Sequence, residues 1–216
     1  MTRLILLGGF LGSGKTTTLL RLGRKLALDG KRVGVIANDQ GHELVDTELF
    51  KASGFLTREV RGGCFCCRLD DFIAQAEALT TEQAPDFLLA EPVGSCTDLV
   101  ATVLRPLRNL YPARFEISPF AVLIDPLRAR NVLANDGNAS FAEKVTYIYK
   151  LQQMEADAIA INKTDLLTPS ELATLRELLK TRFPQKQVLE LSSLRGAGFD
   201  SFVGWLLDSA EGGLLA

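Results

Sequence analysis

The stretch RLILLGGFLGSGKTTT, residues 3–18, contains the feature that decides the fold of this chain. A largely apolar run, Arg3–Leu7, leads into the segment Gly9–Thr16, which fits the pattern GxxxxGK[ST] and opens an amphipathic stretch. In this strand–loop–helix order, glycines allow the backbone to turn tightly, and successive N–H groups then surround phosphate oxygens. The segment therefore predicts a phosphate-binding loop at the end of a buried first strand.

The side chains of this loop indicate how a nucleotide and its metal ion would be held. Lys15 can reach the β- and γ-phosphates, the Thr16 hydroxyl can bind Mg²⁺, and Thr17 is placed for the α-phosphate. A glycine-rich turn without a ligand is the alternative, which the strand–loop–helix context disfavours. The backbone N–H groups expected to contact phosphate belong to Gly12, Ser13 and Gly14.

Apolar runs alternate with amphipathic stretches along the rest of the chain. Strands that are apolar throughout indicate a sheet buried on both faces, so we expect a three-layer α/β fold of the P-loop NTPase type. Its central sheet should be mostly parallel and flanked by helices, with ligands at the carboxyl ends of the strands. The predicted strands are Arg3–Leu7, Arg32–Asn38, Phe87–Glu91, Phe120–Asp125, Ala158–Asn162 and Gln187–Leu191, with a weaker one at Thr57–Val60. The predicted helices are Lys15–Leu28, Leu69–Thr80, Thr97–Leu110, Phe141–Glu155, Ser170–Phe183 and Phe199–Ser209.

The sequence NKTD, residues 162–165, closes the predicted fifth strand and indicates a guanine site. The Asp165 carboxylate can accept hydrogen bonds from guanine N1–H and its amino group, whereas adenine would leave it unpaired. The Lys163 stem can cover the base, and Asn162 can tie this loop to the phosphate loop. After the next strand, the backbone N–H groups of Ser193 and Leu194 are candidates for guanine O6. Alone, NKxD is also compatible with an ordinary turn; after a phosphate loop it predicts GTP or GDP.

Two further strand ends supply candidate groups for Mg²⁺ binding and hydrolysis. Glu91 closes the third strong strand, where it can orient Mg²⁺, and the N–H of Gly94 can approach the γ-phosphate. Asp39 and Asp46 flank the expected switch loop as candidate metal ligands or water-orienting groups. A solvated acidic turn is the alternative for each. His42 is the only histidine, and we expect it to be solvated.

Three of the four cysteines form a CxCC cluster, Cys64, Cys66 and Cys67. Soft thiolates suit Zn²⁺ and related ions, and three of them leave one position of a tetrahedral ion open. In an extended segment the first two would point the same way, and a turn would bring the third round. A redox pair or small buried side chains are the alternatives. We expect Cys96 to be packed, although it could be a fourth ligand.

The order of these motifs resembles a known family. The sequences GGFLGSGKTT, NDQG, GGCFCC, EPVG and NKTD look like those of the CobW-type metal-chaperone GTPases, relatives of the GTPases that insert nickel into urease and hydrogenase. The resemblance extends over residues 3–208. Its most specific element is GGCFCC, placed between the switch loop and the ExxG strand.

The resemblance implies slow GTP hydrolysis coupled to handling of Zn²⁺, Co²⁺ or Ni²⁺ for a client metalloprotein. It implies GTP or GDP with Mg²⁺ at Gly12–Thr17 and Asn162–Asp165, and a transition metal at Cys64, Cys66 and Cys67. Homodimers that depend on nucleotide or metal are also implied. Members usually have NEFG at the switch and a Ser/Thr-rich ExxG. This chain instead has NDQG, which departs from the family pattern at Asp39, and EPVG.

Many members also carry a C-terminal domain and a histidine-rich tract. We expect residues 1–216 to form one GTPase domain without that C-terminal domain, so that a client docks on the GTPase domain or on another chain. The net charge is 24 − 26 = −2, with no basic cluster typical of nucleic-acid binding. No apolar run approaches the roughly 20 residues of a membrane span, so we expect a cytoplasmic protein.

Two other functions remain open from the sequence. The chain could be a GTP-driven activator of a metallocofactor enzyme, such as a corrinoid enzyme, with a structural or regulatory metal at the cysteines. A P-loop kinase for a small molecule would need an acceptor site and an arginine-rich lid, and the sequence indicates neither. No glutamine or arginine is identified as a catalytic finger, which a partner could supply.

Overall fold

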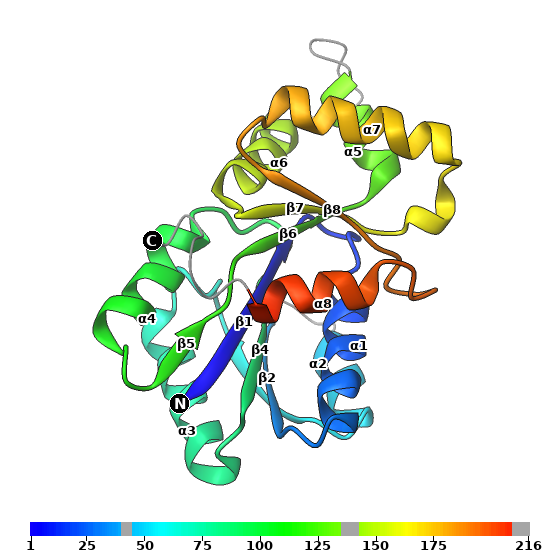
Figure 1. Cartoon of the computed structure of the whole chain (residues 1–216). Coiled ribbons are helices and arrows are strands. Elements are labelled where there is room, and N and C mark those ends of the chain that lie inside the picture. Colours follow the sequence, from blue (N-terminus) through cyan, green and yellow to red (C-terminus); the bar gives the residue numbers. More distant parts are fainter. Residues whose placement is uncertain (40–44, 135–142, 209–216) are drawn as a thin grey trace.

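The computed structural model describes residues 1–39, 45–134 and 143–208, apart from the side chains of residues 39, 45, 46 and 134. Its centre is an eight-stranded sheet in which the strands pair in parallel, which confirms the predicted α/β architecture (Figure 1). The order across the sheet is β3 (Leu56–Arg61), β2 (Val33–Asp39), β4 (Phe87–Glu91), β1 (Thr2–Gly9), β6 (Ala121–Ile124), β7 (Ala158–Ile161) and β8 (Gln187–Glu190). The short β5 (Phe115–Ile117) pairs with the start of β1.

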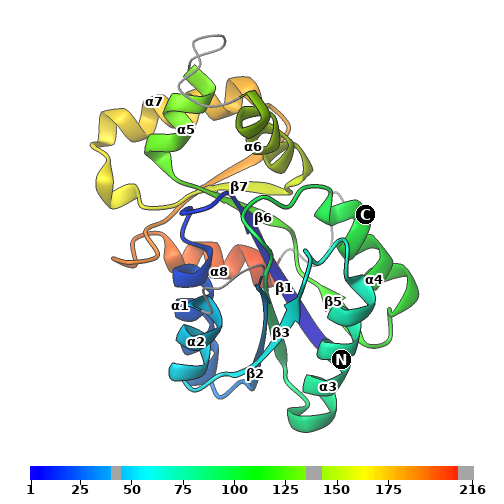
Figure 2. The same cartoon turned by 180° about the vertical axis from the view of Figure 1, so that it is seen from behind.

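Helices cover both faces of the sheet, as Figures 1 and 2 show from opposite sides. Alternate residues of β1 enter two different cores: Leu4 and Leu6 lie in one, Ile5 and Leu7 in the other. This explains why the strands are apolar throughout. One face is covered by α1 (Lys15–Leu28), α2 (Val45–Ala52) and α8 (Phe199–Asp208). The other is covered by α3 (Leu69–Gln83), α4 (Arg105–Leu110), α5 (Pro126–Ala134), α6 (Glu143–Glu155) and α7 (Pro169–Arg182).

The predicted helix Thr97–Leu110 starts later than expected. Asp98 has a φ of +59°, which a continuing right-handed helix does not allow. A π-helical turn, Val100–Leu104, then precedes α4. Pro106, in the first turn of α4, has no N–H to donate, and the widened turn accommodates it. The prediction of one regular helix here was therefore wrong in its start and its form.

Four elements of the described part were not predicted, one of them the short 3-10 turn Thr164–Leu166. Helix α2 occupies part of the expected switch loop, β5 is only three residues long, and α5 follows directly on β6. The start of α5 has a clear cause: the Asp125 carboxylate accepts a hydrogen bond from the Arg128 N–H at 2.9 Å, and Pro126 occupies the first helical position. The sequence Asp-Pro was thus a helix start signal.

The parallel arrangement gathers the predicted motifs at one edge of the sheet. Strand β1 ends at Gly9, β4 at Glu91, β6 at Ile124 and β7 at Ile161, and the loop after each lies at the carboxyl edge, where such sheets bind ligands. Within the described ranges, none of the helices is long and apolar enough to cross a bilayer.

Candidate functional site

The loop between β1 and α1 has the backbone of an anion cradle. Gly12 and Gly14 have φ values of +78° and +94°, and a Cβ on Gly14 would lie 2.4 Å from Nδ2 of Asn162. The Lys15 ammonium bends back over the loop and donates to the Gly9 carbonyl at 3.0 Å. The Ser13 hydroxyl is buried with no hydrogen-bond partner among the described residues. The loop therefore presents a cation and a buried polar atom, which fits a bound phosphate chain.

Thr16 and Glu91 meet beside this cradle. The Thr16 hydroxyl, in the first turn of α1, donates to Oε1 of Glu91 at the end of β4, over 2.8 Å. Glu91 is only 6% exposed. A hydroxyl and a carboxylate oxygen are the hard ligands that Mg²⁺ prefers, so the two predicted metal groups are close enough to serve one ion.

Asn162 connects the base-recognition loop to the phosphate loop, as its position in the sequence suggested. Its Nδ2 donates to the Ser13 carbonyl at 2.9 Å, and its Oδ1 accepts from the N–H groups of Lys163 at 2.8 Å and Ser193 at 3.0 Å. The residue is 1% exposed. In this structure the Ser193 N–H donates to Asn162, and its contact with guanine O6 stays a prediction. Leu194, the other candidate, lies exposed beside it.

Lys163 spans the gap between two loops and reveals a residue that sequence reasoning missed. Its backbone is left-handed, with a φ of +56°, and its ammonium donates to the Gly12 carbonyl at 2.7 Å and to Asp125 at 2.9 Å. Burial raises the pKa of Asp125, but the Arg128 N–H and Lys163 outweigh it and hold that pKa below its usual value. The sequence did contain a signal for this residue: Asp125 directly follows β6, and charged residues at strand ends line such sites.

Asp165, the predicted guanine-binding residue, is hydrogen-bonded to Ser192. The Ser192 hydroxyl donates to Oδ1 of Asp165 and accepts from the Arg195 N–H at 3.0 Å. Ser192 is fully buried, so its hydroxyl holds the carboxylate in one orientation. A carboxylate has two acceptor oxygens, so it could accept from two adjacent donors of a guanine ring.

Gly94 brings the loop after β4 against the phosphate loop. A Cβ at Gly94 would lie 2.7 Å from the backbone nitrogen of Leu11, so only glycine allows this approach. At the same loop, the Arg128 guanidinium donates to the Leu11 carbonyl and lies 5.1 Å from the centroid of the Phe10 ring. Arg128 was not predicted, because its helix was not.

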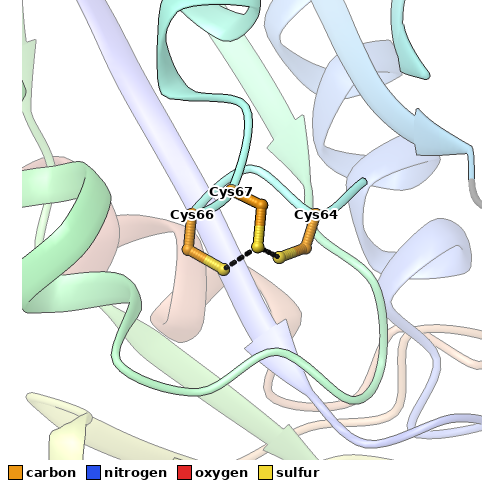
Figure 3. A group of neighbouring side chains, drawn as sticks. All are labelled: Cys64, Cys66 and Cys67. Carbon is orange, nitrogen blue, oxygen red and sulfur yellow. Dashed lines mark hydrogen bonds between the residues drawn. The ribbon is translucent and has the colours of Figure 1, made fainter. Parts of the chain in front are cut away.

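The three clustered cysteines face one another, as Figure 3 shows. Their Sγ atoms lie within 4.8 Å of one another, with Cys64 and Cys67 at 3.2 Å and Cys66 and Cys67 at 4.0 Å. Tetrahedral zinc with Zn–S bonds of about 2.3 Å requires S···S distances of about 3.8 Å. The cluster therefore fits a thiophilic ion with small adjustments.

A turn, and not an extended segment, brings these thiols together. The N–H groups of Cys67 and Arg68 both donate to the Cys64 carbonyl at 3.0 Å. Asn38 at the end of β2 holds the segment, because its side chain donates to the Gly63 carbonyl at 2.7 Å and accepts from the Phe65 N–H at 3.0 Å. The turn expected to bring Cys67 round is present, but it already begins at Cys64, so that Cys64 and Cys66 do not lie in an extended segment, and the support from Asn38 was missed.

The neighbourhood of the thiols shifts their protonation. Burial raises the pKa of Cys64, but hydrogen bonds with Cys66 and Cys67 outweigh it and leave that pKa below its usual value. Burial and the interaction with Cys64 raise the pKa of Cys66 to about 12. Cys96 is 5% exposed in the core against which Cys64 and Cys66 pack, consistent with the packed role expected for it. Burial, followed by those two neighbours, raises its pKa as well.

The remaining predicted residues contribute less to this picture. Thr17 is exposed in the first turn of α1. Asp39 ends β2, and Asp46 lies in the first turn of α2 and not in a loop, while both side chains are outside the described part. His42 also lies outside the described residues. Their predicted roles stay predictions.

Known proteins are similar in sequence to this chain. Residues 3–190 match the family described as CobW/HypB/UreG, nucleotide-binding domain. Zinc chaperone CobW of Sinorhizobium sp is 31% identical over 202 residues, covering 84% of this chain and 56% of that protein. Zinc chaperone YeiR of Escherichia coli (strain K12) is 30% identical over 195 residues, covering 88% and 55%. The chain thus spans about half the length of these curated relatives.

A solved structure shows the same fold. The crystal structure of HypB from Helicobacter pylori in complex with nickel has a TM-score of 0.64 to this chain at 19% identity. The match covers 97% of this chain and 87% of that one. This likeness supports the fold described above.

Proposed function

The chain belongs to the CobW/HypB/UreG family of nucleotide-binding domains, and from this premise we propose that it is a GTP-binding, slowly GTP-hydrolysing metallochaperone. In this proposal the cysteine cluster carries Zn²⁺, or Co²⁺ or Ni²⁺, and the state of the nucleotide controls delivery to a client metalloprotein. The observation that carries it is the convergence of three thiols within 4.8 Å of one another.

The nucleotide half of the proposal rests on the loops at the carboxyl edge of the sheet. Lys15 provides positive charge for the β- and γ-phosphates, and the Asp165 carboxylate, oriented by Ser192, selects guanine. Thr16 and Glu91 are the residues that would hold Mg²⁺, which when bound neutralises charge developing on the phosphate oxygens. Gly94, packed against Leu11, is placed to respond to the γ-phosphate.

The metal half rests on the chemistry of the thiols and on relatives. The two curated relatives are both named zinc chaperones. A site with three protein thiolates leaves one tetrahedral position for an incoming or departing ligand, which suits a cargo ion more than a closed structural site. Cys67 is exposed, so a client could reach the ion from solvent.

Equilibrium dialysis with Zn²⁺ or Co²⁺ tests this function. We expect about one ion per chain, and loss of that ion when Cys64, Cys66 and Cys67 are all changed to Ser. The matched control is Cys96→Ser, which removes a neighbouring thiol outside the three-thiol group and should keep the ion. An unchanged metal stoichiometry in the triple variant would show that the cluster is not the metal site and overturn the proposal.

A further inference from the structure

The loop after β4, residues 92–98, lies between the proposed nucleotide site and the cysteine cluster. On one side, Gly94 packs against the backbone of Leu11 in the phosphate loop. On the other, Cys96 is buried in the core against which Cys64 and Cys66 pack. Only one residue separates Gly94 from Cys96. A displacement of this loop at the phosphate loop should therefore also move it at the cysteine cluster.

A buried side chain of α6 holds the backbone at the centre of this loop. Gln152 of α6 is 2% exposed, and its Nε2 donates both to the Gly94 carbonyl at 3.0 Å and to the Cys96 carbonyl at 2.8 Å. An amide nitrogen has two N–H groups, so one side chain satisfies both acceptors. The backbone completes the turn, because the Cys96 N–H donates to the Val93 carbonyl at 3.0 Å.

Two other residues of α6, one turn before and one turn after Gln152, contact the same region of the structure. Tyr149, one turn earlier, packs edge-on against Phe10 of the phosphate loop with ring centroids 6.3 Å apart. Glu155, one turn later, accepts from the Val100 N–H at 3.3 Å, just beyond the loop. Residues at this spacing share one face of a helix. This face therefore touches the phosphate loop, the loop after β4 and the start of the π-helical turn.

We propose that Gln152 is the positioning residue through which the nucleotide and metal sites are coupled. It fixes the loop so that Gly94 stays against the phosphate loop while Cys96 stays beside the cysteine cluster. The inference rests on the function proposed above and adds to it a physical connection. Coupling between two ligands is reciprocal, so the residue should affect nucleotide-dependent metal affinity and metal-dependent nucleotide affinity equally.

The test measures the ratio of two Co²⁺ affinities, with GDP and with a non-hydrolysable GTP analogue, followed by the thiolate-to-cobalt absorption band. The variant is Gln152→Met, which keeps the length of the side chain and removes both N–H groups. Gln153→Met is the matched control: Gln153 is equally buried on the same helix, but its amide donates at 2.8 Å to the Tyr149 carbonyl of its own helix.

In the wild-type chain we expect the two affinities to differ by about 5- to 150-fold, the usual range for coupled sites. Gln152→Met should bring the ratio to within about twofold of one while each ligand still binds, and Gln153→Met should keep it. If Gln152→Met does not fold, Gln152→Leu, which also removes both N–H groups and carries no charge, takes its place with the same expectation.

Three results overturn the inference: a ratio of one in the wild-type chain, an unchanged ratio in the Gln152 variant, or an equal loss in the Gln153 control. The last two of these results leave the proposed function standing, provided that the cysteines still bind Co²⁺, whereas a ratio of one in the wild-type chain also contradicts the proposed control of metal delivery by the nucleotide. Absence of any Co²⁺ bound by the cysteines would instead contradict the proposed function itself.

Discussion

The Thr16 hydroxyl donates a hydrogen bond to Oε1 of Glu91 over 2.8 Å, although 75 residues separate them in the chain. The contact exists because β1 and β4 are neighbours in the sheet, so the first turn of α1 lies beside the end of β4. Two oxygen ligands from different elements are thereby held together before any ion binds. Such preorganisation lowers the cost of assembling a Mg²⁺ site.

Changing Thr16 to Ala should reduce Mg²⁺-dependent GTP hydrolysis by about 10- to 100-fold, the usual range when a supporting group of a metal site is removed. The reason is the loss of the hydroxyl that we place beside Glu91. Thr16→Ser, which keeps the hydroxyl, is the control and should remain within a few-fold of the wild type. Release of phosphate across a Mg²⁺ titration measures the effect, and equal activity of the Ala and Ser variants would contradict it.

Changing Asp165 to Asn should exchange guanine for xanthine. A carboxylate accepts from guanine N1–H and its amino group, whereas an asparagine amide can accept from xanthine N1–H and donate to its O2. Since hydrogen bonds to a charged group contribute about 1.5–3 kcal/mol each, GTP affinity should fall by at least about 100-fold. Competition between GTP and XTP for a fluorescent nucleotide measures this, and an unchanged preference for GTP would show that Asp165 does not read the base.

The sequence was most informative where a motif contains its own structural context. The stretch from Arg3 to Leu28 includes the strand, the glycine turn and the helix that together build the phosphate loop, so spacing alone predicted its form. Asn162 was correctly expected to contact that loop, because both motifs end parallel strands of one sheet. The same reasoning explains why Thr16 lies beside Glu91, since the two residues also follow or end parallel strands of this sheet.

What the sequence did not reveal are the partners that come from elsewhere in the chain. Asp125 and Arg128 support Lys163 and Leu11, but helix α5, which contains Arg128, has only nine residues and was not predicted, although Asp125 and Pro126 mark its start. Gln152 is a polar residue in a helix and would ordinarily be placed on the surface, yet the loop after β4 buries it. Local pattern does not record such contacts, because tertiary packing decides them.

Changing Gly94 to Ala should weaken nucleotide binding by about 10- to 100-fold. The new Cβ would lie 2.7 Å from the Leu11 nitrogen, and relieving such a contact by shifting backbone costs about 1–3 kcal/mol. Gly34→Ala is the control: this buried strand glycine would place its Cβ 3.4 Å from a methyl of Leu88, an ordinary contact. Affinity for a fluorescent GTP analogue measures the effect, and similar affinities for the two variants would contradict it.

Glu155 should make stability depend on pH near neutrality. Burial raises its pKa to about 7, with Asp98 adding to the effect and backbone N–H groups opposing it, whereas the ordinary value is 4.5. Between these two values the folded chain retains a proton that the unfolded chain releases, so the free energy of unfolding falls as pH rises. The total change from this one group is up to about 3 kcal/mol and is complete above pH 7.

Glu155→Gln isolates that contribution, because the amide oxygen can still accept from the Val100 N–H but carries no charge at any pH. Urea unfolding at pH 5 and pH 8 should show the variant gaining stability over the wild type by up to about 3 kcal/mol at the higher pH only. The exposed Glu177→Gln variant controls for removal of one negative charge from a helix. Parallel pH profiles for wild type and Glu155→Gln would show that the buried carboxyl group does not govern this dependence, since all other titrating groups cancel in the comparison.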